Sequence, residues 1–146
     1  MFSRQIDKIL AVDNVTKSLY RGSFPMDRLP TERGNGIYII NTDDHDQPGS
    51  HWVAVFVEDE RVEYFDSYGL PPLDSRCERF LGSNYWFNSY QLQQLYSNAC
   101  GYYCVYFVLQ RARGHTANTI LNILSKTDSG FVVKNHLYKR YKSVFN

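Results

Sequence analysis

The chain has 146 residues, 43% of them hydrophobic and 16% aromatic, which allows one hydrophobic core but leaves no room for a second domain. Sixteen basic and fifteen acidic side chains give a formal net charge of +1, which excludes binding to nucleic acid or anionic membranes by bulk charge. No apolar run approaches the roughly 20 residues of a membrane span, and the start lacks a signal-peptide core. We therefore expect one intracellular, monomeric domain over residues 1–146, without a membrane partner.

The three cysteines predict a reduced protein. Three thiols cannot all pair with one another, and none has the CxxC spacing of a zinc site. This argues against a disulfide framework and against a structural metal. We expect a reducing compartment and at least one thiol free for chemistry.

The first half of the chain alternates short elements with turns. Residues 3–10 carry apolar side chains at helical spacing behind Ser3, a candidate N-cap. Residues 21–30 (RGSFPMDRLP) have the composition of a turn-rich connection. Residues 36–41 (GIYIIN) predict a buried strand, and the polar residues 42–50 predict an exposed loop.

The most regular β pattern lies in the middle of the chain. Residues 52–57 (WVAVFV) and 62–66 (VEYFD) are apolar runs on either side of the turn sequence EDER. Two such runs predict an antiparallel hairpin with its turn centred on Asp59 and Glu60.

The register of this hairpin makes a geometric prediction. With that turn, paired positions add up to about 119, so Val53 lies opposite Asp66 and His51 lies opposite Tyr68. His51 and Asp66 are then diagonal neighbours on one face, whereas a shift of one residue would separate them. A carboxylate there can accept a hydrogen bond from one imidazole nitrogen, which leaves the other nitrogen to take a proton from a thiol.

The second half of the chain is mainly helical. The expected elements are a short helix over 74–80 capped by Asp74, a strand over 85–92, a nearly all-apolar helix over 98–113, and helices over 116–127 and 129–142 capped by Thr116 and Ser129. Strands that come first and helices that follow are typical of the α+β class. We expect a mainly antiparallel sheet packed against a central buried helix that carries a nucleophile, with further helices at the C-terminus.

Cys100 is the candidate nucleophile. Ser97 and Asn98 before it are good helix caps, which would place the thiol in a first helical turn where unpaired N–H groups favour a thiolate. Gly101 after it leaves room for a substrate carbonyl to approach the backbone. Gln94, six residues before the cysteine, could donate its amide N–H to a developing oxyanion.

Each of these residues also has an ordinary structural interpretation. A buried free cysteine is usually a small hydrophobic residue, which is how we interpret Cys104, while Cys77 on a charged helix predicts a surface thiol. His51 could simply begin a strand, and Asp66 could begin a turn.

Taken in order, the motifs GSHW, YFDSYG, Gln94 and SNACGYYC resemble the adenain family of adenovirus-type cysteine proteases, which includes viral and Polinton-like transposon-encoded members. The resemblance rests on His51-Trp52, residues 65–69 and residues 99–102, and it reaches upstream through YRGSFP and IYIINTDD. It covers roughly residues 15–112.

The resemblance implies a papain-like, adenain-like protease fold with His51, Asp66 and Cys100 as the catalytic residues and Trp52 and Gly101 at the substrate. It implies cleavage of virion precursor proteins at small-residue or glycine-containing sites during virion maturation, in the host nucleus and virion. It also implies an activating peptide or DNA as candidate cofactors, with no metal or redox cofactor. A basic stretch near the C-terminus could contact DNA, although a solvated helix face is the commoner explanation: Lys134, Lys139, Arg140 and Lys142.

Alternatives remain at this point. The motif order and the QxxxxxCG spacing are also similar to those of the SUMO-deconjugating proteases, whose substrates are ubiquitin-like conjugates. The position of the glutamine differs by one residue between branches of this clan, and we take Gln94 rather than Gln93. A catalytically inactive binding module and a nucleic-acid-binding domain are the alternatives from other functional classes.

Overall fold

The computed structural model describes residues 1–94, 97–126 and 128–146, and it is an α+β structure. In these ranges the strands form one five-stranded sheet in the order β1-β2-β3-β4-β5. The strands are β1 (Tyr20–Pro25), β2 (Gly36–Asn41), β3 (Trp52–Glu58), β4 (Arg61–Phe65) and β5 (Trp86–Phe87). The pairs β2–β3 and β3–β4 are antiparallel, whereas β1–β2 and β4–β5 are parallel. The sheet is therefore mixed, not mainly antiparallel as we expected.

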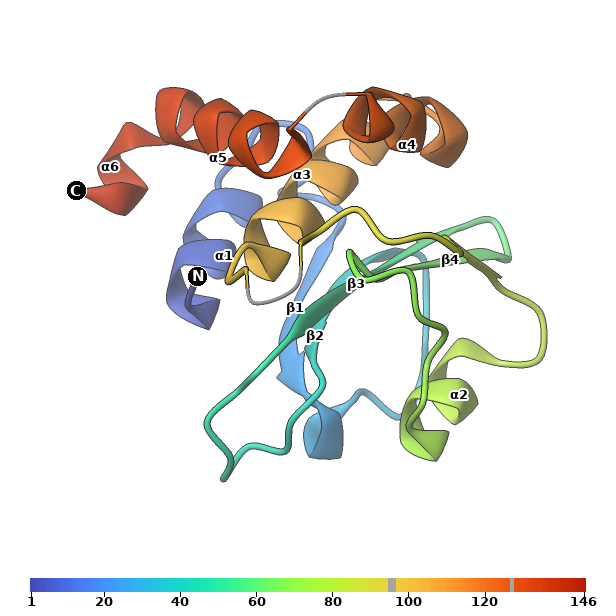
Figure 1. Cartoon of the computed structure of the whole chain (residues 1–146). Coiled ribbons are helices and arrows are strands. Elements are labelled where there is room, and N and C mark those ends of the chain that lie inside the picture. Colours follow the sequence, from blue (N-terminus) through green and yellow to red (C-terminus); the bar gives the residue numbers. More distant parts are fainter. Residues whose placement is uncertain (95–96, 127) are drawn as a thin grey trace.

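Helices cover both faces of this sheet (Figure 1). They are α1 (Ser3–Leu10), the 3-10 turn η1 (Met26–Arg28), α2 (Ser75–Leu81), α3 (Cys100–Ala112), α4 (Ala117–Ser125), α5 (Ser129–Arg140) and α6 (Lys142–Phe145). Figure 1 shows α1, α3, α4 and α5 on one side and α2 on the other. The predicted buried helix is α3, and it packs directly on β3.

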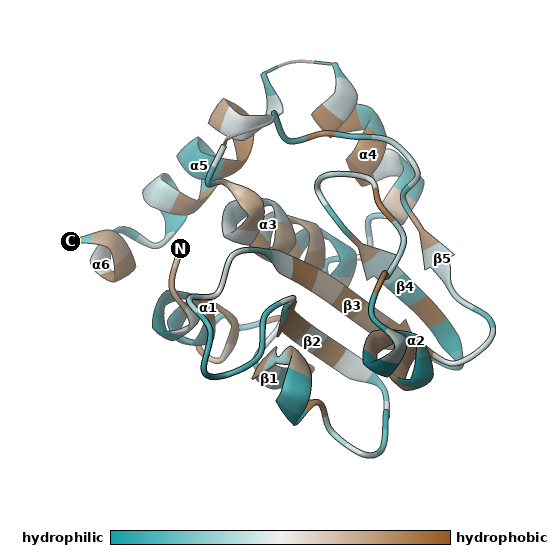
Figure 2. Cartoon of the chain, turned by 60° about the horizontal axis from the view of Figure 1, so that its bottom comes forward, coloured by the Kyte–Doolittle hydropathy of each residue, from teal (hydrophilic) through white to brown (hydrophobic). Residues whose placement is uncertain are grey.

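Two apolar layers hold the sheet between the helices. Alternate strand residues face the layer that contains α3, among them Ile37, Ile39, Ala54, Phe56 and Phe65. Their neighbours face the layer that contains α2, among them Tyr38, Ile40, Val53, Val55 and Tyr64. Because both faces are buried, β2 and β3 are apolar nearly throughout, as Figure 2 shows.

The hairpin has the predicted register. Ala54 pairs with Phe65 and Val57 pairs with Val62, so paired positions add up to 119. The two-residue turn places Asp59 at φ 48° and Glu60 at φ 70°, both in the left-handed region that a tight hairpin turn requires. The prediction of the register is confirmed.

Two segments differ from their sequence-based assignments. The region expected to be turn-rich contains β1, which pairs in parallel with β2, with an irregularity between Tyr20 and Gly22. An edge position tolerates both Gly22 and Pro25, which are poor residues for a central strand. Of the strand expected over 85–92, only Trp86–Phe87 forms, because the N–H groups of Leu92 and Gln93 donate to the carbonyl oxygen of Ser67 instead.

Helix caps were predicted with mixed success. Asp74 and Thr116 cap α2 and α4 through their side chains, as expected. Phe2 rather than Ser3 is the N-cap of α1, and Asp128 rather than Ser129 is the N-cap of α5. Thr127, the last residue of the helix expected over 116–127, lies outside the described residues.

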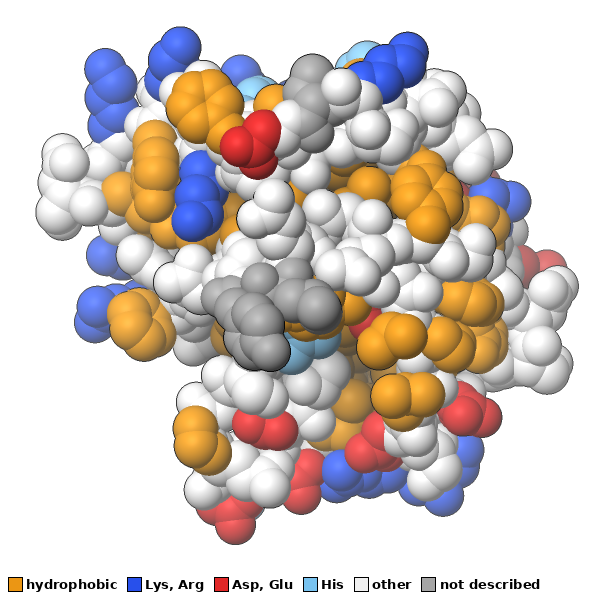
Figure 3. Space-filling model, in the orientation of Figure 1, with side chains coloured by type: hydrophobic (Ala, Val, Ile, Leu, Met, Phe, Trp, Pro, Cys, Tyr) orange, Lys and Arg blue, Asp and Glu red, His pale blue; other side chains and the backbone are white. Residues whose placement is uncertain are grey.

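Apolar side chains are exposed where the chain enters α2. Leu70 and Leu73 are 49% and 81% exposed, and Figure 3 shows apolar side chains gathered on this face, below the helical layer. Among the described helices, none is long and apolar enough to cross a membrane.

Candidate active site

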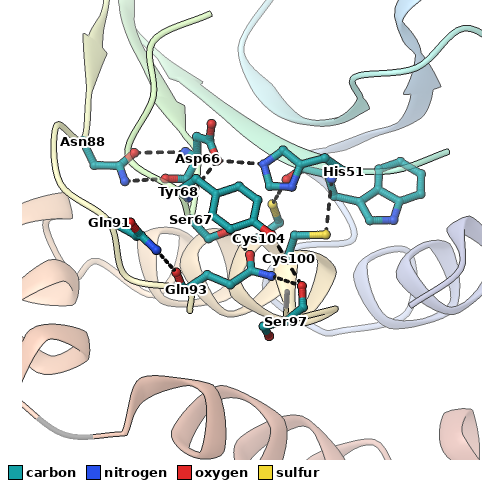
Figure 4. A network of polar contacts seen from close by, with 11 residues as sticks. His51, Asp66, Ser67, Tyr68, Asn88, Gln91, Gln93, Ser97, Cys100 and Cys104 are labelled. Atoms are coloured by element: carbon teal, nitrogen blue, oxygen red, sulfur yellow. Dashed lines mark hydrogen bonds and ion pairs between the residues drawn. The ribbon is translucent and has the colours of Figure 1, made fainter. Parts of the chain in front are cut away.

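The hairpin brings His51 and Asp66 together, His51 just before β3 and Asp66 just after β4. Nε2 of His51 lies 2.7 Å from Oδ1 of Asp66, and the two side chains are 15% and 6% exposed (Figure 4). The same carboxylate oxygen accepts the main-chain N–H of Tyr68 at 2.9 Å. The Tyr68 ring stacks on the imidazole with 4.7 Å between ring centroids, so His51 is held both at its edge and on its face.

Cys100 is the first residue of α3 and is 8% exposed. Its thiol group lies near enough to His51 for the imidazole to lower the thiol pKa, and its sulfur accepts the main-chain N–H of Trp52 at 3.5 Å. Because an ionised Asp66 can only accept, Nε2 of His51 carries the hydrogen of that bond. Nδ1 is then the nitrogen left for the thiol. The structure thus brings together all three residues predicted to carry the chemistry.

The electrostatics of these groups favour an ion pair. Burial lowers the pKa of His51, but the hydrogen bonds with Asp66 and Cys100 outweigh burial and raise the pKa to about 9. Burial raises the pKa of Cys100, but His51 and the N–H groups of Trp52 and Gly101 lower it below its usual value. A raised histidine pKa and a lowered thiol pKa favour thiolate and imidazolium together.

The other two thiols have the opposite environment. Cys104 is fully buried one turn further along α3, as predicted, and burial raises its pKa well above the ordinary value. Cys77 is 1% exposed, because α2 packs it with Phe80 and Leu81 against the sheet, and burial raises its pKa to about 12. The expectation that Cys77 is a surface thiol is therefore wrong.

The start of α3 differs from the predicted cap. Its N-cap is Ala99, which makes no side-chain cap hydrogen bond. Ser97 instead accepts the N–H of Ala99 through its hydroxyl at 3.2 Å. The N–H of Cys100 belongs to the first helical turn, where no earlier helix carbonyl can accept it. That N–H is suited to bind an external oxygen atom.

The two candidate glutamines have different environments. Gln94 is exposed and lines a cavity of about 360 Å³ with Ser97 and Phe131. Gln93 is 1% exposed, and its Oε1 accepts the hydroxyl of Ser67 at 2.5 Å while its Nε2 donates to the carbonyl of Ser97 at 2.7 Å. Because the carbonyl of Ser97 can only accept, it fixes which end of the amide is the NH₂ group, and that group points toward the start of α3 (Figure 4).

Sequence reasoning missed Asn88. This side chain is 1% exposed and bonds the main chain of Asp66 twice, accepting its N–H at 3.0 Å and donating to its carbonyl at 2.6 Å. Asn88 thus fixes the end of β4 that presents the carboxylate. The sequence did contain a sign of this role, because an amide side chain within the aromatic residues 85–92 needs hydrogen-bond partners once it is buried.

Trp52 and Gly101 lie beside Met1. The indole N–H of Trp52 donates to the carbonyl of Met1 at 3.0 Å. A Cβ on Gly101 would lie 2.8 Å from Cβ of Met1 and 3.3 Å from the Trp52 ring, so only glycine permits this packing. Their predicted contacts with a substrate stay predictions.

Two further features bear on cofactors and partners. Within the described ranges, no group of three His, Cys, Asp or Glu side chains is arranged to hold a metal ion. Of the basic C-terminal residues, Lys139, Arg140 and Lys142 are exposed, and Nζ of Lys134 lies 5.6 Å from the centroid of the Tyr102 ring. Their contact with DNA stays a prediction.

Comparison with known proteins gives one informative similarity. No protein-family model matches the chain. The chain is 33% identical over 113 residues to an Acanthamoeba polyphaga mimivirus protein named “putative thiol protease”. The aligned part is 66% of this chain and 36% of that protein, so the chain spans about a third of the length of the relative it matches. The chain is therefore similar to a viral protein whose name refers to the chemistry of a reactive cysteine.

Proposed function

We propose that this chain is a thiol protease domain in which Cys100 is the nucleophile, His51 the acid and base, and Asp66 the group that orients His51. The observation that carries the proposal is the 2.7 Å contact of His51 with Asp66 at the start of the helix that carries Cys100, together with the pKa shifts of His51 and Cys100 in opposite directions. The similarity to the mimivirus protein supports the same chemistry.

The proposed reaction proceeds through an acyl-enzyme. The Cys100 thiolate attacks the scissile carbonyl carbon, and the C=O electron pair moves onto oxygen. When the tetrahedral intermediate collapses, the C–N bond breaks and protonated His51 gives its proton to the leaving amine. His51 then takes a proton from water, which attacks the thioester, releases the carboxylic acid and restores the thiolate.

We propose Gln93, in place of Gln94, as the side chain that stabilises the oxyanion. Its amide is buried, and the carbonyl of Ser97 orients the NH₂ group toward the start of α3. Together with the main-chain N–H of Cys100 it would supply two donors. One of its N–H groups donates to the carbonyl of Ser97, and the other, which has no partner among the described residues, would donate to the substrate oxygen.

For the substrate we propose precursor proteins of a virus or virus-like element, cut at small-residue or glycine-containing sites during virion maturation. Two features support this: the adenain-like order of His51-Trp52, Asp66 and Ala99-Cys100-Gly101, and the viral source of the relative. Membership of the adenain family is part of the proposal.

The test is cleavage of a pooled peptide library rich in glycine-containing sites, with products identified by mass spectrometry. Wild-type protein should cut a subset of peptides, and Cys100→Ala should cut none while keeping its fold. Cys104→Ala is the matched control, because it removes a thiol one turn along the same helix. The proposal is wrong if Cys100→Ala cuts the same peptides as the wild type, or if the wild type cuts none.

A further inference from the structure

A pocket of about 460 Å³ adjoins the proposed active site. Three site residues form part of its wall, namely His51, Asp66 and Tyr68. The rest of the wall is mostly apolar and includes Met26, Tyr64, Leu70, Pro71, Pro72 and Leu73. The pocket is therefore continuous with the side of the site that carries the imidazole.

The chain between β4 and α2 forms the rim of this pocket. Gly69 has φ 75°, and a Cβ there would lie 2.3 Å from the carbonyl carbon of Tyr90, so the turn out of β4 requires glycine. The sequence Leu-Pro-Pro-Leu follows, and its prolines lack N–H groups for a sheet. Leu70 and Leu73 remain 49% and 81% exposed at the rim, while Met26 and Tyr64 are each only 3% exposed. Exposed leucines beside a buried apolar floor suit an apolar ligand group.

The reaction places one half of the substrate next to this pocket. His51 must lie within hydrogen-bond reach of the leaving amine in order to protonate it. The acyl half stays bonded to Cys100, so the residues that leave with the amine begin at the imidazole. Their side chains are then the substrate groups nearest to the wall formed by His51 and Tyr68.

The charges of the pocket restrict what it accepts. Its wall contains the carboxylates of Asp66 and Asp74 and no lysine or arginine. Asp66 is bonded to His51, and Asp74 is paired with Arg76. His51 and Arg76, the two basic groups beside the pocket, are thus already paired with carboxylates, and an acidic substrate side chain would lose hydration and meet like charges. An aliphatic or aromatic side chain meets neither penalty.

Building on the proposed protease function, we propose that this pocket binds a large apolar side chain of the substrate, one or two residues after the scissile bond. The pocket would thus select the amine half of the cleavage site.

Acyl transfer to added amines tests this directly. A peptide thioester ending in Gly-Gly acylates Cys100, and the thiol of the thioester leaves. The acyl-enzyme then reacts with water to give a peptide acid or with an amine to give a peptide amide. Chromatography measures the ratio of the two products. Leucinamide or glycyl-leucinamide should capture the acyl-enzyme roughly tenfold better than glycinamide or glycyl-glycinamide, because an apolar side chain becomes buried. The amide of aspartic acid should capture it least well.

Variants at the rim connect the preference to the pocket. Leu70→Ser and Leu73→Ser change exposed residues, so the fold should persist, and each should move the leucinamide to glycinamide ratio toward one. Val12→Ser is the matched control, because Val12 is 71% exposed and does not line the pocket.

The outcomes separate the pocket from the protease proposal. If leucinamide and glycinamide captured the acyl-enzyme equally well while thioester hydrolysis was intact, the proposed role of the pocket would be wrong and the protease proposal would stand. A preference that survives in both leucine variants would also overturn it. Failure of the wild type to turn over any thioester or label Cys100 would refute both.

Discussion

Replacing Asp66 with Asn should change the pH dependence of the reaction. The pKa of His51 is about 9, whereas its ordinary value is 6.5. The difference means that the folded protein favours the protonated ring by about 3 kcal/mol. Asp66 supplies much of this preference, since its hydrogen bond is the foremost contribution that raises the pKa. With a neutral amide at position 66, the lowering effect of burial would be opposed less strongly, and we expect the pKa of His51 to fall well below 9.

The direction of the effect follows from the ion pair. In the wild type, activity should rise with pH as Cys100 becomes a thiolate and fall near pH 9 as His51 loses its proton. In Asp66→Asn the alkaline limb should move from pH 9 toward neutral pH, and the acid limb should move up because the thiolate loses its cationic partner. At neutral pH, kcat/KM should fall by about 10²–10⁴-fold, since His51 also loses its fixed orientation.

The assay is kcat/KM on a cleaved peptide from pH 5 to 10, in parallel with the rate at which iodoacetamide alkylates Cys100. Glu58→Gln removes an exposed carboxylate from the same hairpin and should leave both profiles unchanged. If Asp66→Asn kept its alkaline limb near pH 9 and its wild-type alkylation rate, Asp66 would not control the protonation of His51.

Two further predictions concern the oxyanion and the hairpin turn. Gln93→Ala should lower kcat by about 10²–10³-fold and leave the alkylation rate of Cys100 unchanged, because the amide would act on the transition state and not on the thiol. Replacing the exposed Gln94 with Ala should leave kcat near the wild-type value. If steady-state kinetics gave the reverse ranking, Gln94 and not Gln93 would be the oxyanion donor. Glu60→Gly should raise the free energy of unfolding by about 0.5–1 kcal/mol in urea titrations, because it relieves a left-handed non-glycine residue at φ 70°. No gain in stability would mean that Glu60 is not strained, and activity should not change.

The parts of the fold that local rules determine could be predicted. The register of the β3–β4 hairpin follows from a two-residue turn between apolar runs, and it places His51 near Asp66. The position of Cys100 at the start of α3 follows from the long apolar run after it.

Features that depend on tertiary packing could not be predicted. The residues of β1 resemble a loop, because a parallel edge strand tolerates Gly22 and Pro25. The choice between Gln93 and Gln94 depends on Ser67, which lies 26 residues earlier in the chain. The burial of Cys77 depends on which face of α2 meets the sheet, and its charged neighbours obscured that face.

The most direct test of the central claim is covalent labelling with an irreversible, thiol-directed peptide electrophile, followed by mass spectrometric mapping of the modified cysteine. All three cysteines are free thiols, so Cys77 and Cys104 serve as internal controls in the same molecule. We predict rapid modification of Cys100 alone at neutral pH, at a rate that falls sharply in His51→Ala. Modification of Cys77 or Cys104 in preference to Cys100, or a rate at Cys100 that does not depend on His51, would contradict the proposed active site.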